Sequence, residues 1–265
     1  MIDARILDRP PRRKRFGQHF LHDPSVLDRI VSAVAPRRGD HIVEIGPGGG
    51  ALTQRLLESG IDGLDAVEID RDLAALLPAR FASHQGFTLH QGDALEFDFA
   101  GLARSRGGRL RVVGNLPYNI STPLLFHLLQ SSASIEDMHV MLQREVAERL
   151  AAAPGDPSYG RLTIMMAPWV GVELLFEVGP GAFRPPPKVW SAVARLTVRR
   201  EPSFKVSPHF AGVVAAAFSH RRKTLRNALK GVVSLEQIQA CGLDAGVRPE
   251  TLAPAAFNEL ALQLD

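Results

Sequence analysis

The segment Glu44-Ile45-Gly46-Pro47-Gly48-Gly49-Gly50-Ala51 follows a short apolar run, residues 41–45, and leads into a stretch with helical spacing, residues 51–59. Glycine tolerates left-handed backbone, so this segment can turn sharply and let a ligand approach the main chain. A strand, a glycine-rich turn and a helix in this order begin a βαβ unit. We therefore expect an α/β domain with a ligand site at this turn.

Short apolar runs alternate with helical ones on both sides of this segment. An earlier helix is predicted after Asp23-Pro24, an N-cap followed by proline at the first helical position, and it stops before Pro36. The alternation predicts a doubly wound, mostly parallel sheet that binds its ligand at the carboxyl ends of the strands. Further strands are expected at residues 64–69, 87–90, 111–114, 138–142, 170–178 and 190–198, and further helices at residues 71–83, 122–130 and 144–153.

The pattern becomes purely helical near residue 207. Helices are predicted at residues 209–218, 222–229, 235–240 and 251–262. The chain is therefore expected to form two domains, an α/β domain over residues 1–200 and a small all-helical domain over residues 201–265.

The composition excludes several classes of protein. The chain has 265 residues, of which 45% are hydrophobic and 22% charged, as in globular proteins with a real core. The single cysteine, Cys241, cannot form an internal disulfide, and no apolar run reaches the 18 residues that span a bilayer. The basic N-terminus lacks the apolar core of a secretion signal. We expect a cytoplasmic protein that does not enter membranes.

The net charge of +3 is unevenly distributed along the chain. Residues 1–30 carry +3, residues 31–179 carry −6 and residues 180–265 carry +6. Basic ends around an acidic middle suit a catalytic body that contacts a polyanion at its edges, although they would also serve solubility alone.

The glycine-rich turn fits two classes of cofactor. Gly46, Gly48 and Ala51 satisfy the dinucleotide pattern G-x-G-x-x-A, whereas Glu44 followed by alternate glycines satisfies the E-x-G-x-G-x-G pattern of S-adenosylmethionine-dependent methyltransferases. Glu68, which ends the next strand, would accept hydrogen bonds from ribose hydroxyls in either class. These residues predict a nucleoside cofactor without choosing one.

The ends of the next two strands favour methyl transfer. Asp93 follows the third predicted strand, where a methyltransferase places an acid near the adenine amino group. Asn115-Leu116-Pro117-Tyr118 ends the fourth. The Asn115 amide oxygen and the Leu116 carbonyl can accept both hydrogens of an adenine amino group, which favours a pyramidal nitrogen with its lone pair free to attack. Pro117 stiffens the turn and Tyr118 offers a face for an extruded base.

Five segments together resemble the ribosomal RNA adenine dimethyltransferase family, and most closely its bacterial small-subunit (16S) branch. The resemblance spans roughly residues 12–260, and it implies that His19 and Leu21 help to enclose the cofactor and that Phe183 covers the target base opposite Tyr118. His19 stands where the family commonly has asparagine, and Trp190 stands where a polar residue is more common. The segments are residues 14–21 (Lys-Arg-Phe-Gly-Gln-His-Phe-Leu), 44–51, 115–118, 183–189 (Phe-Arg-Pro-Pro-Pro-Lys-Val) and 218–225 (Phe-Ser-His-Arg-Arg-Lys-Thr-Leu).

A basic segment in the helical domain is the expected RNA contact. Its cationic residues are Arg221, Arg222, Lys223, Arg226 and Lys230. A continuous helix would place Arg222, Arg226 and Lys230 on one face and leave Leu225 and Leu229 for the core. The alternative is that these residues form only a solvated surface and do not bind RNA. The scattered His residues and lone Cys show no metal-ligand spacing, so no metal is expected.

The resemblance implies an enzyme that uses S-adenosylmethionine to dimethylate two adjacent adenines near the 3′ end of 16S rRNA, in the small ribosomal subunit or its precursor, as a monomer. A dehydrogenase would share the glycine turn and Glu68 but has no use for residues 115–118 as an adenine clamp. A large-subunit rRNA methyltransferase and an assembly factor with secondary methylation remain as alternatives.

Overall fold

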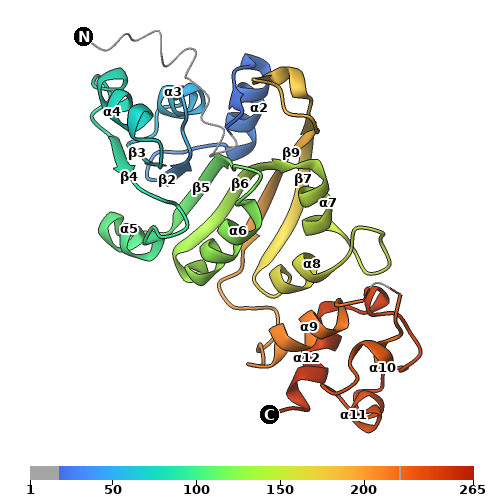
Figure 1. Ribbon diagram of the computed structural model, residues 1–265. Coiled ribbons are helices and arrows are strands. Elements are labelled where there is room, and N and C mark those ends of the chain that lie inside the picture. Colours follow the sequence, from blue (N-terminus) through green and yellow to red (C-terminus); the bar gives the residue numbers. More distant parts are fainter. Residues whose placement is uncertain (1–17, 221) are drawn as a thin grey trace. The chain divides into compact units, whose positions relative to one another are not determined.

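The computed structural model describes residues 18–220 and 222–265 and divides the chain into two compact units (Figure 1). The first unit runs up to Ala147 and resumes over Val172–Val198. The second comprises Glu148–Gly171 and Arg199–Asp265. The division falls close to the expected boundary at residue 200, but the segment Glu148–Gly171 groups with the helical unit rather than with the α/β unit.

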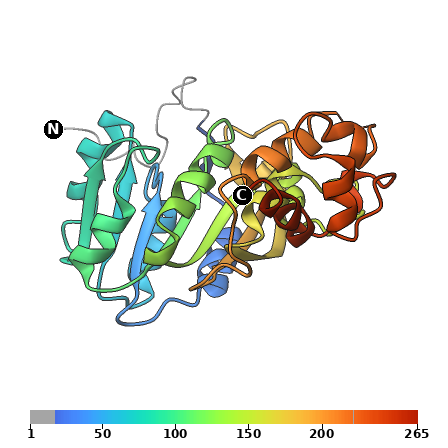
Figure 2. The same cartoon turned by 90° about the horizontal axis from the view of Figure 1, so that it is seen from below.

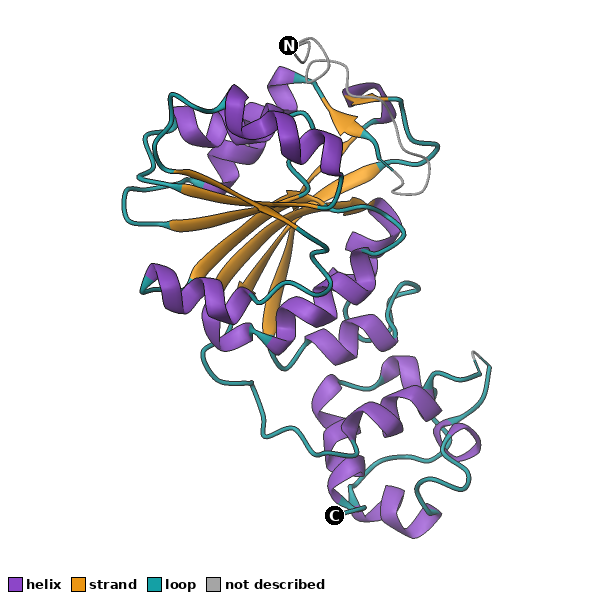
Figure 3. Cartoon of the chain, turned by 60° about the vertical axis from the view of Figure 1, so that its left-hand side comes forward, coloured by secondary structure: helices purple, strands orange, loops and turns teal. Residues whose placement is uncertain are grey.

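The first unit contains a seven-stranded sheet of order β4-β3-β2-β5-β6-β9-β7. Strands β4, β3, β2, β5 and β6 pair in parallel, and β9 is antiparallel to β6. Helices lie on both faces of the sheet (Figure 3), so the predicted doubly wound fold is confirmed. The strands are β2 His41–Ile45, β3 Leu64–Glu68, β4 Phe87–Gln91, β5 Leu110–Asn115, β6 Ile135–Gln143, β7 Val170–Val178 and β9 Ser191–Val198.

The helices of this unit start at the signals that the sequence carries. Pro24 occupies the first turn of α2, and the Asp23 carboxylate accepts hydrogen bonds from the N–H groups of Ser25 and Val26. Helix α5 was not expected, because its eight residues follow an Asp98 cap with little apolar periodicity. The helices are α2 Pro24–Val34, α3 Ala51–Glu58, α4 Arg71–Arg80, α5 Phe99–Arg106, α6 Ser121–Gln130 and α7 Arg144–Ala151.

One face of the sheet is sealed by the apolar sides of α2, α3 and α4. Ile30 of α2, Leu56 of α3 and Leu77 of α4 are buried in a single core cluster with sheet residues such as Val113. Burial of each such side chain stabilises the fold by about 1.5 to 3 kcal/mol. This packing fixes the positions of the turns at the carboxyl ends of the strands.

A second, two-stranded sheet lies beside the main one. Strand β1, Phe20–Leu21, pairs antiparallel with β8, Phe183–Arg184, so that Leu21 lies opposite Phe183. Two-residue strands carry no periodicity, and this pairing of distant segments was not predicted.

The second unit is built from short helices (Figure 2). They are α8 Arg161–Met166, α9 Phe210–Ala217, α10 Leu225–Ala228, α11 Leu235–Ala240 and α12 Pro254–Leu262. Phe210, Leu225, Leu229, Ile238 and Phe257 are fully or almost fully buried in its core. None of the helices in the described ranges has the length and apolar character needed to cross a bilayer.

The prediction of a helix over residues 222–229 is wrong in extent. Thr224 is extended, with φ −67° and ψ 160°, and α10 covers only four residues. The N–H groups of Leu225 and Arg226 donate to the carbonyls of Val247 and Ala245, so a neighbouring loop takes the place of an earlier helical turn. Arg222 and Lys230 consequently lie outside the helix and do not share a helical face with Arg226.

Replacement of Gly50 by alanine should destabilise the first unit beyond the effect of its backbone angle. Gly50 has φ +84°, and a Cβ there would lie 2.7 Å from the buried Phe81 ring. Gly60→Ala is a matched control, because Gly60 also has φ +84° but nothing lies within 4 Å of the added Cβ. Urea titrations should show Gly50→Ala to be less stable than Gly60→Ala by about 1 to 3 kcal/mol, the scale of overpacking. Equal stabilities would contradict the tight contact.

Candidate active site

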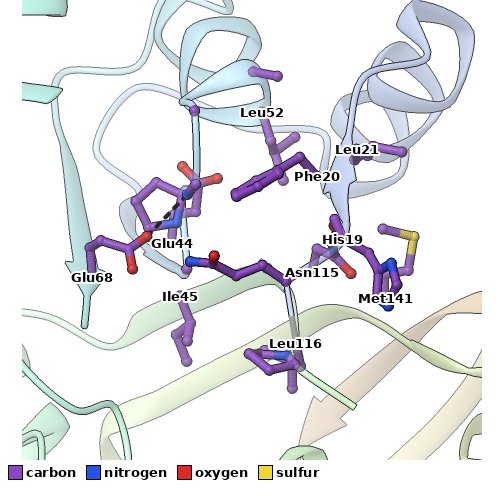
Figure 4. Close-up of a pocket in the computed structure, with 18 of the residues that line it drawn as sticks. His19, Phe20, Leu21, Glu44, Ile45, Leu52, Glu68, Asn115, Leu116 and Met141 are labelled. Atoms are coloured by element: carbon purple, nitrogen blue, oxygen red, sulfur yellow. Dashed lines mark hydrogen bonds between the residues drawn. The ribbon is translucent and has the colours of Figure 1, made fainter. Parts of the chain in front are cut away.

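A pocket of about 370 Å³ opens at the carboxyl ends of β2, β3 and β5 (Figure 4). Ligands of doubly wound sheets bind at this edge. Seven residues predicted for the site line this pocket together: His19, Leu21, Gly46, Gly48, Glu68, Asn115 and Leu116.

The glycine turn leaves main chain open to the pocket. Gly46 has φ +69°, and a Cβ there would meet nothing within 4 Å, so the backbone borders empty space that a ligand can fill. Gly48 has φ +58°, and a Cβ there would lie 2.9 Å from the Phe20 ring. Both positions therefore need glycine, one for the close approach of a ligand and the other for the packing of Phe20.

The Glu68 carboxylate is buried at the end of β3 and faces the pocket. Its oxygens accept hydrogen bonds from the backbone N–H of Gly48 at 3.2 Å and from that of Asp70 at 2.8 Å. Burial raises the pKa of Glu68 to about 7, against the effect of these hydrogen bonds. Each oxygen retains a lone pair for a ligand hydroxyl, as the predicted ribose contact requires.

Glu44 is the second buried carboxyl group at this pocket. Its oxygen accepts a hydrogen bond from the Thr53 hydroxyl at 2.6 Å. Burial raises the pKa of Glu44 to about 8, and the nearby Glu68 carboxylate adds to the rise. At neutral pH the Glu44 side chain is therefore mostly uncharged, which suits a group beneath the glycine turn. Glu44 begins the E-x-G-x-G-x-G motif, but it was not predicted as a residue of the cofactor site.

The Asn115 side chain is oriented by a hydrogen bond from its Nδ2 to the His19 carbonyl oxygen, 2.8 Å away. Because the amide nitrogen is engaged as a donor, the amide oxygen is the group left to accept hydrogen bonds from a ligand. Leu116 follows with its N–H bonded to the Met141 carbonyl. The two acceptors predicted for an adenine amino group thus belong to a turn that two other segments hold in place.

Tyr118 lies beside the lined pocket, and its ring already has a neighbour. The His19 imidazole stacks on it with ring centroids 5.7 Å apart and an interplanar angle of 27°. The Tyr118 hydroxyl is 2.6 Å from the Ser191 hydroxyl, and His19 Nδ1 is 2.8 Å from the Pro185 carbonyl oxygen. His19 therefore connects the turn of residues 115–118 with the proline-rich loop of residues 183–189.

Phe183 lies in the core of the first unit and is not among the residues that line the pocket. Its side chain is 2% exposed and packs in the core, because the β1–β8 pairing sets it opposite Leu21. The contact of this ring with a base opposite Tyr118 stays a prediction. The neighbouring residues Arg184 and Pro185 line the pocket instead.

Asp93 caps a turn in this structure. Its Oδ1 accepts a hydrogen bond from the Leu95 N–H at 2.9 Å, and the adjacent Ala94 lines the pocket. Two further lining residues, His139 and Met141, were missed because they belong to the apolar run of β6, which carries no signal of a site. Burial lowers the pKa of His139, so its ring is neutral at physiological pH.

The basic residues of the second unit are exposed. Arg222, Lys223, Arg226 and Lys230 are all solvent-accessible, whereas Leu225 and Leu229 are buried as predicted. Arg221 lies outside the described residues. Within residues 18–220 and 222–265, no cluster of three His, Cys, Asp or Glu side chains could hold a metal ion.

Comparison with known proteins decides between the possible families. Residues 11–265 match the family described as ribosomal RNA adenine dimethylase. The chain belongs to this family. It is 57% identical over 259 residues to Ribosomal RNA small subunit methyltransferase A of Pseudomonas aeruginosa, covering 95% of this chain and 94% of the relative. It is 53% identical over 251 residues to the protein of that name from Marinobacter nauticus, with 94% and 90% covered.

Two solved structures share the fold of this adenine dimethylase. A dimethyladenosine transferase from Plasmodium falciparum superposes with a TM-score of 0.81 at 26% identity, covering 93% of this chain and 97% of that one. The 23S rRNA methyltransferase ErmE gives a TM-score of 0.73 at 26% identity, covering 93% and 99%. The predicted class, an S-adenosylmethionine-dependent rRNA adenine dimethyltransferase, is confirmed, and the dehydrogenase alternative is excluded.

The affinity of this dimethylase for S-adenosylmethionine should fall as the pH drops below about 7. In the predicted contact, ribose hydroxyls donate to the Glu68 carboxylate, and the raised pKa means that protons would compete with the cofactor there. The dissociation constant should rise by up to about tenfold per pH unit on the acid side. Isothermal titration calorimetry at pH 6, 7 and 8 measures this dependence.

Glu68→Gln separates this dependence from the titration of other groups. The variant should bind about 1 to 3 kcal/mol more weakly at pH 8, because one buried acceptor is lost, and its affinity should not follow the pH. Asp62→Asn, at a carboxylate paired with Arg38, is the control and should behave as wild type. If Glu68→Gln retains the wild-type pH dependence, Glu68 does not bind the ribose.

Proposed function

We propose that this enzyme transfers methyl groups to the exocyclic amino nitrogens of two adjacent adenines near the 3′ end of 16S rRNA, in the small ribosomal subunit or its precursor. The observation that carries the proposal is Asn115, whose amide is oriented by the His19 carbonyl at the edge of a pocket with an open glycine turn. The relatives at 57% and 53% identity carry small-subunit names, which favours this substrate over large-subunit rRNA.

Different residues of the pocket contact different parts of the cofactor. Glu68 accepts the ribose hydroxyls, and the open backbone at Gly46 allows close approach of the remainder. His19 and Leu21 form the wall that closes the pocket from β1. When bound, S-adenosylmethionine supplies an electrophilic methyl group on a positively charged sulfur. Asp93, beside the lining residue Ala94, is proposed to meet the adenine end of the cofactor.

The turn after β5 activates the target nitrogen. An adenine amino group is a weak nucleophile because its lone pair is delocalised into the ring. Asn115 Oδ1 and the Leu116 carbonyl accept its two hydrogens, which holds the nitrogen pyramidal and leaves its lone pair directed at the methyl group. Tyr118 supports the extruded base. Alignment of nitrogen and methyl group then supplies most of the rate, with no covalent enzyme intermediate.

The exposed basic residues of the second unit are proposed to bind rRNA phosphates. Residues 219–235 contain no Asp or Glu, and four exposed cations lie within this segment. Phosphate contacts of this kind supply affinity without reading sequence. We further propose that the enzyme acts as a cytoplasmic monomer.

Asn115→Ala should slow catalysis without preventing substrate binding. The amide oxygen interacts more strongly with the pyramidal transition state than with the planar ground state, so its loss lowers kcat rather than affinity. We expect kcat to fall by roughly 10² or more, the scale for loss of one preorganised polar group. Radiolabelled methyl transfer to small subunits lacking the modification, followed by mapping of the labelled nucleotides, measures it.

Exposed Asn119 provides the control for this substitution. Asn119→Ala should methylate at the wild-type rate, and calorimetry should show that Asn115→Ala still binds S-adenosylmethionine. A wild-type kcat for Asn115→Ala at saturating cofactor would remove Asn115 from the mechanism. In a parallel reaction with unmodified large subunits, label on large-subunit rRNA and none on small-subunit rRNA would redirect the proposed substrate.

Charge reversal at Arg222 and Arg226 should weaken subunit binding and flatten its dependence on salt. Each lost phosphate contact should reduce the slope of log affinity against log salt by about 0.7 to 0.9. The double variant with Arg38→Glu and Arg104→Glu, at two other exposed arginines, changes the net charge by the same amount and should keep the wild-type slope. An unchanged slope for the double variant would show that these residues form only a solvated surface.

A further inference from the structure

Trp190 is a half-exposed aromatic residue that has no role in the proposed cofactor and adenine sites. It lies directly before β9, and it is 50% exposed to solvent. A Cβ on Gly179 would come within 3.6 to 3.9 Å of three carbons of the indole ring, so the ring packs against the Gly179 main chain. The ring is thus supported by backbone and still open to solvent.

Two neighbouring parts of the chain link Trp190 to the proposed base-binding turn and to the pocket. The next residue, Ser191, contacts the Tyr118 hydroxyl at 2.6 Å. Arg184 and Pro185, earlier in the same loop, line the pocket. An exposed ring therefore lies on the segment that joins the pocket lining to the Tyr118 support.

The loop that leads to Trp190 carries only basic charges. Residues 179–190 contain Arg184 and Lys188 and no acidic residue. Both are exposed, and neither forms an ion pair within the described part of the chain. The nearest acidic residue before the loop, Glu177, is 3.7 Å from the Arg144 guanidinium. Unpaired cations in the same loop as an exposed aromatic ring fit a single-stranded nucleic acid, whose bases stack and whose phosphates need counterions.

We propose that Trp190 is a stacking platform for an unpaired rRNA nucleotide next to the adenine being methylated, with Arg184 and Lys188 on its phosphates. Extrusion of one base from a stack leaves its neighbours with an open face, which an aromatic side chain can cover. This inference rests on the proposed function and names a further specificity-determining contact for the same substrate. A docked apolar protein surface is the competing occupant, and the two unpaired cations disfavour it.

Tryptophan fluorescence tests the contact without any need for methylation. The chain has two tryptophans, so Trp169→Phe leaves Trp190 as the only reporter. Titration with a single-stranded RNA of about ten nucleotides should quench this emission to saturation, and added Lys188→Ala should weaken the binding. The matched control, Trp190→Phe, reports from Trp169 and should show little quenching. Absence of quenching in Trp169→Phe at RNA concentrations that bind would overturn the proposal.

Methylation kinetics test its importance for the substrate. Trp190→Ala should raise KM for unmodified small subunits by about tenfold, whereas kcat and S-adenosylmethionine affinity should stay at wild-type values. Trp190→Phe should recover most of the loss, because a phenyl ring still stacks. Leu174→Ala, another exposed apolar residue of this unit at 42% exposure, is the control and should leave KM unchanged. Equal KM values for Trp190→Ala and Leu174→Ala would overturn the proposal.

The two experiments separate this inference from the function on which it rests. If the wild-type enzyme places no label on small-subunit rRNA, the proposed function fails. The fluorescence experiment alone then tests whether Trp190 stacks on RNA. If the wild type methylates but Trp190 affects neither quenching nor KM, the function stands and the stacking platform is wrong. Thermal melting of each variant establishes that it is folded.

Discussion

Between Ile45 and Ala51 the chain leaves the sheet, reverses and begins α3, and it does so through left-handed backbone at Gly46, Gly48 and Gly50. The Glu68 carboxylate accepts the N–H of Gly48, which ties this turn to the end of β3. Parallel pairing of β2 with β5 sets Ile45 opposite Gly114, so Asn115 comes next to the same turn. The glycine turn and the turn of residues 115–118 are therefore neighbours because of backbone geometry.

Strand β3 carries two buried acids with different surroundings. Arg106 forms two hydrogen bonds to the Asp65 carboxylate, and His90 contacts it at 2.7 Å. Glu68 is held by backbone N–H groups at the edge of the pocket, and burial raises its pKa to about 7. A carboxylate without a cation at that distance is a better acceptor for a ligand, because its charge is not already neutralised. One acid thus stabilises the sheet edge while the other remains available.

Much of the first unit could be predicted from the sequence because strands and helices there have clear and different periods. Helix ends at Asp23 and the glycine turn of residues 46–50 carry local signals, and Glu68 and Asn115 were placed by position at strand ends. The buried position of Phe183 could not be predicted, since it depends on pairing with Leu21, 162 positions earlier in the chain. The short α10 had the same cause: carbonyls of residues 245 and 247 capture N–H groups that a local pattern assigns to a longer helix.

His19 makes three contacts at once: its carbonyl accepts from Asn115, its ring stacks on Tyr118, and its Nδ1 meets the Pro185 carbonyl. A base that uses the same face of Tyr118 must first displace the imidazole. The net stacking energy of that base is then the difference between its own stacking on Tyr118 and that of the imidazole. A slow exchange of the two rings would limit how quickly the base binds. Loss of the His19 ring would strengthen base stacking on Tyr118 while loosening the wall of the pocket, so the same residue would affect the two binding steps in opposite directions.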